Sequence, residues 1–355
     1  MTTQPFITPS GGERAARRRR RRRTGIAVLA AALLAGGILA MTLASGSNAS
    51  HRRTPATRVA AARPAPPPRS PYGLPLGRPA LALTGLQGTS QDPVHMRFHA
   101  PPRAGLLFDL SSGRVLWQRN ATLRLPIASL TKMMTALLAV QAAPPDTPVL
   151  ITRQAVAEGG SKVGELPLGG HVRLESLLYG LLLPSGNDAA VALAQNVAGS
   201  IAGFVARMNV AAARLGLGCT RYSSPSGYYD AGNFSCAADL AVLAHDDLAQ
   251  PRIARVTRTF TAVLPFPIKG GKLYLDNNNP LLLFGYPGVT GLKTGYTIAA
   301  GRCLVATAER HGVRLGVVLL HSPEPANQAR RLLDRAFTDV YHLPRVAEPA
   351  MPAGA

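Results

Sequence analysis

The sequence contains few cysteines, and their spacing argues against a metal site. Its 355 residues include three cysteines, Cys219, Cys236 and Cys303, and no two of them have CxxC spacing. Because no histidine cluster lies near them either, we expect no zinc or other metal site. In an exported protein Cys219 and Cys236 could form a disulfide, with Cys303 buried in an apolar strand. Sequence alone does not fix that pairing.

Acidic residues are also scarce, at 18 against 39 lysines and arginines, which gives a formal net charge of +21. The surplus is uneven, because the chain before residue 95 holds 14 arginines, no lysine and only two acidic residues. Hydrophobic residues make up 46% of the chain, enough for a globular protein with a substantial core. The charge therefore does not by itself indicate a nucleic-acid-binding protein.

The N-terminus combines a basic run with an apolar segment. Seven consecutive arginines, Arg17 to Arg23, precede residues 25–44, which contain no charged residue. About 20 apolar residues match the thickness of a bilayer, and flanking arginines keep their side cytoplasmic. We expect residues 1–23 to be cytoplasmic and residues 24–44 to be a transmembrane anchor or a signal segment. The arginine run could also be the arm of a cytoplasmic nucleic-acid-binding protein. The adjacent apolar segment contradicts a cytoplasmic location for the protein, so no nucleic-acid partner is expected.

The remaining chain divides by composition. Residues 45–94 are rich in Pro, Ala and Arg and predict a solvated linker. Residues 95–345 predict one catalytic domain, and residues 346–355 predict a disordered tail. The domain would lie outside the cytoplasm, on the cell membrane if the segment is an anchor, or secreted if it is cleaved.

Within the domain, strand patterns enclose a helical middle. "AGLLFDLSSGRVLWQRN" predicts a hairpin, and a buried helix is expected from Ser129 to about Gln141. Ala- and Leu-rich stretches with helical periodicity follow. Strand patterns return after Pro251 and include a hairpin with the turn "HG", and a closing helix is expected from about Pro325 to Tyr341. This order predicts an α+β fold with an inserted helical lobe.

The first candidate site motif is Ser129-Leu130-Thr131-Lys132. Residues three apart share one face of a helix, so the Lys132 amine can reach the Ser129 hydroxyl. A serine at a helix start also lies beside unpaired N–H groups that would stabilise an oxyanion. By itself the motif is far more typical of an ordinary helix start, where Ser is favoured.

The second motif is Ser185-Gly186-Asn187, which predicts a loop before a helix that begins near Asp188. Such a loop can present a hydroxyl for proton relay and an amide that holds a substrate carbonyl. An ordinary connection between helices has the same residue types.

The third motif is Lys293-Thr294-Gly295, within a predicted strand. A glycine inside a strand weakens it unless a backbone or ligand approaches closely. The cation and hydroxyl could receive a terminal carboxylate of an extended peptide. Alone, this motif would describe a solvated strand.

Together and in this order, the motifs resemble the signature of class A β-lactamases and penicillin-binding proteins. The segment from about Ala104 to Leu343 resembles the D-alanyl-D-alanine carboxypeptidase family, the low-molecular-mass penicillin-binding proteins. The resemblance extends to "GELPLGGHVRLESLLYGLLLPSGNDAAVALA" and "GVTGLKTGYTIAAGRCLVATAERHG". It implies a β-lactamase/DD-peptidase-like fold, with an antiparallel five-stranded sheet flanked by helices and an inserted all-helical lobe.

The resemblance also implies residue roles and partners. Ser129 would be the nucleophile, Lys132 its base and Ser185 a proton relay. Substrate would bind through Asn187, Lys293, Thr294, Gly295 and Tyr296, and the N–H groups of Ser129 and Tyr296 would form the oxyanion hole. The implied substrates are peptidoglycan stem peptides, with β-lactams as covalent inhibitors and no cofactor.

Three alternatives share these motifs. A DD-endopeptidase or transpeptidase would differ in the bond attacked or in the acyl acceptor, which the sequence does not decide. A class A β-lactamase needs a glutamate after the second motif, and there is none between Asn187 and Lys293. A catalytically silent wall-binding protein is disfavoured because Ser129, Lys132 and Lys293 are intact.

Overall fold

The computed structural model describes residues 68–86, 92–229, 231–267 and 269–346. The expected cytoplasmic and membrane segments, and nearly all of the expected tail, lie outside these ranges. Among the described residues no single helix has the length and hydropathy to cross a bilayer; one bent pair of helices, 187–198 with 201–214, passes on length and composition together.

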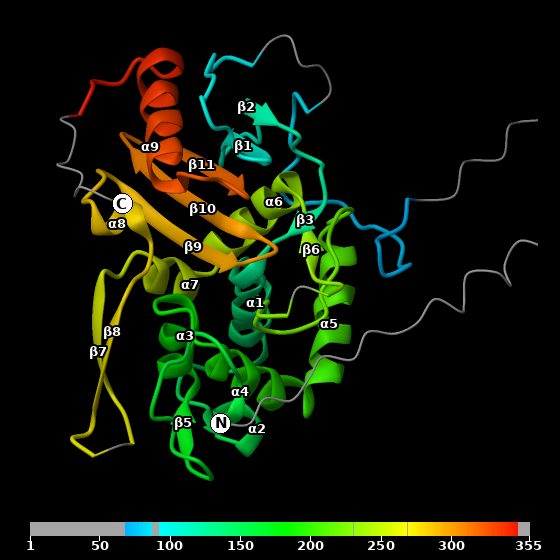
Figure 1. Cartoon of the computed structure of the whole chain (residues 1–355), viewed down its shortest axis with the longest axis vertical. Helices are drawn as coiled ribbons and strands as arrows, with labels where there is room; N and C mark the ends of the chain where they lie inside the picture. Colours follow the sequence, from blue (N-terminus) through cyan, green and yellow to red (C-terminus); the bar gives the residue numbers. More distant parts are fainter. Residues whose placement is uncertain (1–67, 87–91, 230, 268, 347–355) are drawn as a thin grey trace, which may run out of the picture. The chain divides into compact units, whose positions relative to one another are not determined.

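A five-stranded antiparallel sheet forms the centre of the domain, in the order β2-β1-β11-β10-β9 (Figure 1). Its strands are β1 (Ala104–Asp109), β2 (Val115–Arg119), β9 (Val289–Thr297), β10 (Gly301–Arg310) and β11 (Val313–Leu320). Both expected hairpins are present, β1–β2 and β10–β11. The predicted α+β fold with a five-stranded sheet is therefore confirmed.

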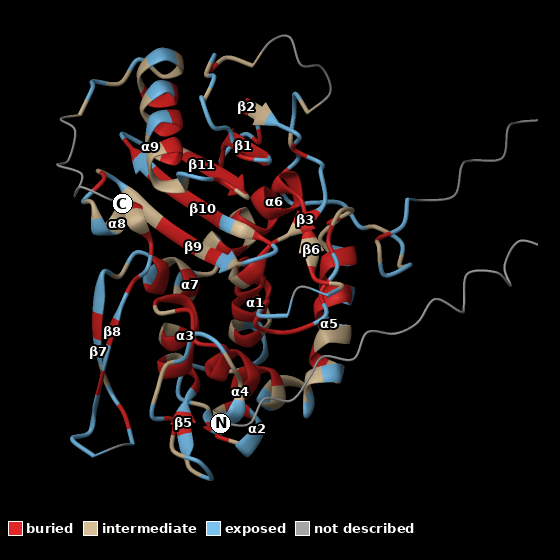
Figure 2. Ribbon diagram, in the orientation of Figure 1, coloured by how far each residue is buried: buried red, intermediate tan, exposed pale blue. Residues whose placement is uncertain are grey.

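The sheet is buried on both faces, and its alternating residues enter two separate cores. On β1, Leu106 and Phe108 enter the core shared with the lobe, whereas Leu107 enters the core on the opposite face. Side chains of a strand point alternately to its two faces, so a nearly continuous apolar strand such as β1 supplies both cores. Figure 2 shows buried positions in red along β9 to β11 and in α1, α3 and α4.

The chain between β2 and β9 forms the lobe. Its helices are η1 (Ala128–Thr131), α1 (Lys132–Ala142), α2 (Arg153–Ala157), α3 (Leu174–Leu182), α4 (Asn187–Ala198), α5 (Ile201–Arg214), α6 (Ala237–Leu248), α7 (Pro251–Thr257) and α8 (Pro280–Leu283). The opposite face of the sheet is covered by α9 (Pro325–Arg335), which continues into η2 (Ala336–Val340).

The expectation of an all-helical lobe is wrong, because three short strand pairs interrupt the helices. They are β3 (Leu125–Pro126) with β6 (Phe234–Ser235), β4 (Pro148–Leu150) with β5 (His171–Arg173), and β7 (Thr261–Pro265) with β8 (Lys272–Asp276). The β4–β5 pair buries one apolar residue from each strand, Val149 and Val172. The strand pattern expected after Pro251 includes β7, whereas the strands of the other two pairs are only two or three residues long and leave too little alternation in the sequence to be recognised.

Part of the expected linker packs onto the domain. Gly77 N–H donates to Ala213 O on α5 at 2.8 Å, and Thr84 exchanges backbone hydrogen bonds with the β1–β2 turn. Leu81 is buried in the core shared with the lobe. Residues 68–86 are therefore not a solvated tether, because their scattered leucines have apolar surface to cover.

The disulfide that the sequence left open is present between Cys219 and Cys236, and Cys303 is buried in β10. Among the described residues, one group of possible metal ligands comes together, Cys219, Cys236 and Asp239. Because both sulfur atoms are in the disulfide, neither offers a thiolate.

Gly316 on β11 is required by its partner across the sheet. It pairs with Phe108 on β1, and a Cβ at Gly316 would lie 2.3 Å from the Phe108 ring. We expect Gly316→Ala to lower the free energy of unfolding by about 1–3 kcal/mol through overpacking. Denaturant unfolding measures this change.

The matching control is the double variant Gly316→Ala with Phe108→Leu. If the ring is the obstacle, the double variant is less destabilised than the sum of the two single variants. Simple additivity would contradict this explanation.

Candidate active site

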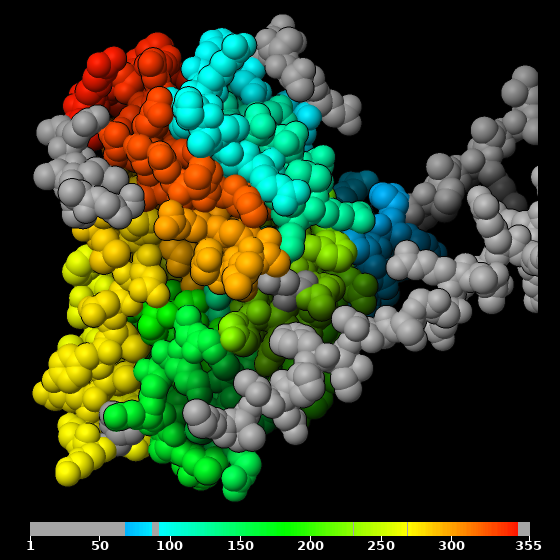
Figure 3. All heavy atoms as spheres, viewed as in Figure 1, coloured from blue at the N-terminus to red at the C-terminus, as the bar shows by residue number. Residues whose placement is uncertain are grey.

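The three motifs meet where the β9 edge of the sheet borders the lobe. Figure 3 shows the orange residues near the β9–β10 turn against the green lobe. A cavity of about 350 Å³ opens here, and five predicted site residues line it: Ser129, Ser185, Thr294, Gly295 and Tyr296. Lys132, Asn187 and Lys293 are buried beside it. The structure thus brings together all eight residues singled out from the sequence.

The Lys132 amine is the centre of the polar contacts. Its Nζ lies 2.8 Å from Ser129 Oγ, 2.6 Å from Asn187 Oδ1 and 2.8 Å from the backbone oxygen of Ser226. A neutral amine has two N–H groups and one lone pair. Since two of the three neighbours are carbonyl oxygens that only accept, the lone pair of a neutral Lys132 is left for the Ser129 hydroxyl.

The surroundings favour that neutral form. Lys132 has no solvent exposure. Burial, and then the positive charge of Lys293, hold the pKa of Lys132 well below its ordinary value of 10.5. The carboxylates of Glu158 and Asp188 act in the opposite direction, and burial outweighs them.

Ser129 lies in the short 3-10 helix η1, and α1 begins only at Lys132. The expected helix start at Ser129 is therefore a tighter turn, which still places the residues three apart side by side. Ala128, immediately before the serine, has a φ of +49°. Such a conformation is uncommon for a residue other than glycine and is often found at functional sites.

Two features behind η1 fix this geometry. The Asn233 side-chain amide donates to Thr131 Oγ1, which donates to Ala128 O. Gly227 has a φ of +73°, and a Cβ there would lie 2.0 Å from Ala128 O. Only glycine allows this approach, so the backbone at Gly227 packs directly against η1.

The second motif is held by the residues that follow it. Ser185 has a φ of +71°, and its buried Oγ makes no hydrogen bond to a described atom. Asn187 begins α4, where it reaches Lys132 with its oxygen and donates Nδ2–H to Gly159 O at 2.6 Å. Ser185 therefore has a hydroxyl available toward the cavity, while the Asn187 side chain is engaged through both its oxygen and its nitrogen.

The third motif lies on β9, as expected. A Cβ on Gly295 would lie 3.0 Å from Ile127 O and 3.1 Å from Ser129 N, so glycine lets the strand approach the serine backbone. Lys293 is buried, its amine donates to Thr294 O at 2.9 Å, and burial lowers its pKa to about 7. Tyr296 extends outward and is 65% exposed.

Sequence reasoning missed several supporting groups. The Asp188 carboxylate accepts N–H bonds from Val163 and Gly164, which holds that loop beside the site. Ser226 contributes only its backbone oxygen, which no residue-type pattern can identify. The glycine of "SPSG" at 224–227 was the one available signal, since it marks a close backbone approach.

Glu158 also lies near the site and was not predicted from the sequence. It precedes Asn187, so it lies outside the stretch between Asn187 and Lys293 that contains no glutamate. Its carboxylate is 3.4 Å from Ser226 Oγ, and burial raises its pKa. The absence of glutamate between Asn187 and Lys293 therefore does not mean that the neighbourhood of Lys132 lacks one.

Comparisons with known proteins agree with this arrangement. The model of the Peptidase_S11 family, D-alanyl-D-alanine carboxypeptidase, matches residues 92–324. D-alanyl-D-alanine carboxypeptidase DacF of Bacillus subtilis is 35% identical over 244 residues, which cover 66% of this chain and 62% of DacF. DacB2 of Mycobacterium tuberculosis, with the same enzyme name, is 36% identical over 245 residues, which cover 67% of this chain and 82% of DacB2.

The fold has solved relatives. The crystal structure of the Streptomyces K15 DD-transpeptidase aligns with a TM-score of 0.64 at 29% identity, covering 69% of this chain and all of that one. This chain spans about six tenths of the length of DacF, so the similarity concerns the part that carries the motifs.

The depressed pKa of Lys293 predicts a pH dependence of stability. Between about pH 7 and the ordinary lysine value of 10.5, the unfolded state binds more protons at this residue than the folded state does. The contribution of Lys293 to the free energy of unfolding therefore rises with pH between these two values. Replacing Lys293 with Met should reduce the rise in unfolding free energy between pH 7 and 9, measured by urea unfolding.

Lys132 contributes a rise of the same sign, so some pH dependence should persist in Lys293→Met. The exposed Lys272 on β8 offers a matched control, and Lys272→Met should keep the full rise. Equal slopes in all three proteins would rule out the burial argument for Lys293.

Proposed function

Because the chain belongs to the D-alanyl-D-alanine carboxypeptidase family, whose model matches more than half of it, we propose that it is a serine-type D-Ala-D-Ala carboxypeptidase. It would remove the terminal D-Ala from peptidoglycan stem peptides during cell-wall maturation. The observation that carries the proposal is the contact of the buried Lys132 amine with Ser129 Oγ at 2.8 Å, with both N–H groups of the amine engaged elsewhere.

The reaction follows from this geometry in two steps. Ser129 Oγ attacks the carbonyl carbon of the penultimate D-Ala and passes its proton to the neutral Lys132 amine. The proton then reaches the leaving nitrogen through the Ser185 hydroxyl, and terminal D-Ala departs as the acyl-enzyme forms. Water hydrolyses that ester and restores the Ser129 hydroxyl. No metal or cofactor enters these steps.

Backbone and strand positions supply the rest of the site. The N–H groups of Ser129 and Tyr296 would bind the oxyanion, and the close approach of Gly295 to Ser129 N supports that pairing. Lys293 and Thr294 would face the terminal carboxylate. With the pKa of Lys293 near 7, its charge, and so its attraction for that carboxylate, would weaken as the pH rises above neutrality.

The protein would act in the cell envelope. The apolar residues 24–44 would anchor the chain, with the catalytic domain outside the cytoplasm, or would be cleaved to release it. β-Lactams would acylate the same serine. A DD-transpeptidase on this site is the second candidate, because the solved relative from Streptomyces K15 carries that name. A DD-endopeptidase would use the same groups.

The first test is the intact mass of the full chain after incubation with a fluorescent penicillin, and after incubation with diacetyl-Lys-D-Ala-D-Ala. We expect one penicillin adduct and released D-Ala with the native chain, and neither with Ser129→Ala, because the attacking oxygen is gone. Ser111→Ala, in the exposed β1–β2 turn, should behave as the native chain.

Other results would assign the alternatives. An adduct without D-Ala release would favour a transpeptidase or endopeptidase, which cross-linked muropeptides would separate. Rapid turnover of nitrocefin would indicate a β-lactamase. No adduct and no release in a folded sample would leave a silent wall-binding protein on the same fold.

Gly295→Ala tests the strand approach. Its Cβ would meet two backbone atoms, Ile127 O and Ser129 N, so β9 must move away from the serine. We expect the acylation rate by penicillin to fall at least tenfold, because misplacement of about 1 Å can cost that much or more. Gly218→Ala, where the new Cβ meets only the flexible end of Leu76, is the matched control. An unchanged rate in Gly295→Ala would show that the strand has room to shift.

A further inference from the structure

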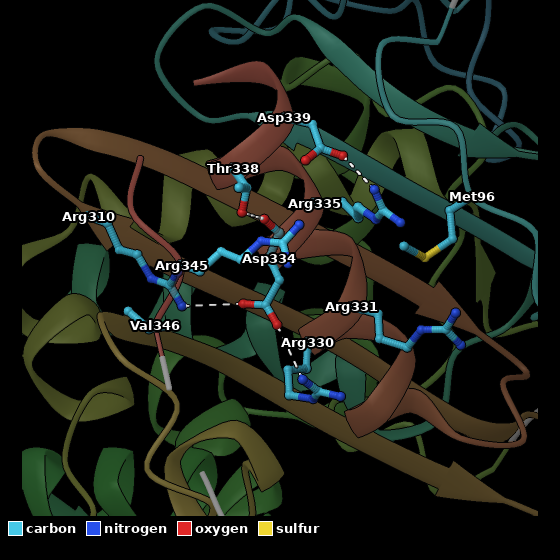
Figure 4. Close-up of a pocket in the computed structure, with 10 residues that line it drawn as sticks. All are labelled: Met96, Arg310, Arg330, Arg331, Asp334, Arg335, Thr338, Asp339, Arg345 and Val346. Carbon is cyan, nitrogen blue, oxygen red and sulfur yellow. Dashed lines mark hydrogen bonds and ion pairs between the residues drawn. The ribbon is translucent and has the colours of Figure 1, made fainter. Parts of the chain in front are cut away.

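A second cavity lies on the side of the sheet covered by α9, apart from the site at Ser129. It has a volume of about 400 Å³ and is lined from α9, η2, the end of β10 and two flanking segments (Figure 4). Its lining residues are Met96, Arg310, Arg330, Arg331, Asp334, Arg335, Thr338, Asp339, Arg345 and Val346. Five arginines and two aspartates leave an excess of three positive charges.

The helix spacing explains how the charges gather. Arg331, Asp334, Arg335 and Thr338 follow the i, i+3, i+4, i+7 pattern of one helix face. Leu332 and Leu333 of the same helix are buried in the core beneath. The apolar residues therefore fix the helix on the sheet and hold its charged face toward the cavity.

Both aspartates of the cavity lining already have partners among the neighbouring side chains. Asp334 accepts from Tyr286 OH at 2.8 Å and pairs with Arg330 at 3.3 Å, while Asp339 pairs with Arg335 at 2.9 Å. Neither Arg331 nor Arg345 forms an ion pair with a described residue. The excess charge thus lies on exposed guanidinium groups at the rim.

Arg310 is a rigid cation in the lining. It is only 9% exposed, and its guanidinium carbon lies over the rings of Tyr286 and Phe337, 4.6 Å from each centroid. Its Nη2 is 3.6 Å from Asp334 Oδ1 and makes no hydrogen bond within the described chain. These two ring contacts and its burial hold the Arg310 side chain in place, so little side-chain entropy is lost when it meets a ligand.

We propose that this cavity binds a phosphate ester. Guanidinium groups bind phosphate oxygens through paired hydrogen bonds. Five arginines line this cavity, and their charge exceeds that of the two aspartates by three. The volume is within the range of small-ligand pockets, so it holds a phosphate together with a small organic group. Met96 and Val346 offer apolar contact for that group. The phosphate can come from a soluble ester or from a lipid headgroup.

Calorimetric titration of the full chain with inorganic phosphate and with glycerol 3-phosphate tests the proposal. The triple variant Arg331→Gln, Arg335→Gln, Arg345→Gln removes three exposed cations and leaves the core unchanged. We expect at least tenfold weaker binding than in the native chain. D-Ala release from the stem-peptide analogue should stay the same, since none of the three lies at Ser129.

A matched control separates this site from general attraction to a basic chain. The triple variant Arg153→Gln, Arg214→Gln, Arg221→Gln removes the same charge from exposed positions elsewhere and keeps the arginine run at 17–23. It should bind phosphate esters as the native chain does. Equal losses in the two triple variants, or no saturable binding in any arm, would overturn the proposal.

Vesicles distinguish the two sources. Sedimentation with phosphatidylglycerol vesicles, compared with phosphatidylcholine vesicles, should show reduced binding only for the α9 variant if a lipid headgroup is the ligand. If the soluble esters alone discriminate between the variants, the ligand is a free phosphate ester. Either pattern supports the site.

Discussion

The interaction on which the site depends is the set of three contacts made by the Lys132 amine. The amine joins η1 through Ser129, α4 through Asn187 and the 226–229 segment through the backbone oxygen of Ser226. Asn187 and Ser226 are 55 and 94 residues away from the lysine in the sequence. A buried amine without such acceptors would be strongly disfavoured, so the lobe must close around it to fold at all.

Burial of cations is also what makes the chemistry available. Lys132 and Lys293 are both taken out of water, and the charge of Lys293 further disfavours a charge on Lys132. A lowered pKa favours the neutral amine, which is the form that can accept a proton from a hydroxyl. The arginines near α9 illustrate the contrast, because a guanidinium keeps its charge in nearly any surroundings and serves binding rather than proton transfer.

Glycines and residues with positive φ angles allow the backbone conformation that this site requires. Gly227 and Gly295 each allow a close backbone approach to η1, the first at Ala128 O and the second at Ser129 N. Ala128 and Ser185 adopt left-handed conformations that cost energy, and the surrounding hydrogen bonds hold them. At the second cavity, the spacing of residues on α9 and η2 gathers most of the charges.

The sequence by itself determined the two hairpins, the strands expected after Pro251, the three motifs and the elements that carry them, and the family resemblance implied the five-stranded sheet. Periodicity and turn residues are local, and each motif spans only three or four residues. Tertiary structure alone decided the pairing of Cys219 with Cys236, the short strand pairs β3–β6 and β4–β5 and the packing of residues 68–86. It also decided which groups surround Lys132, among them Glu158 and the Ser226 carbonyl. These depend on contacts between distant segments and on backbone atoms, which every residue has and no residue type reveals.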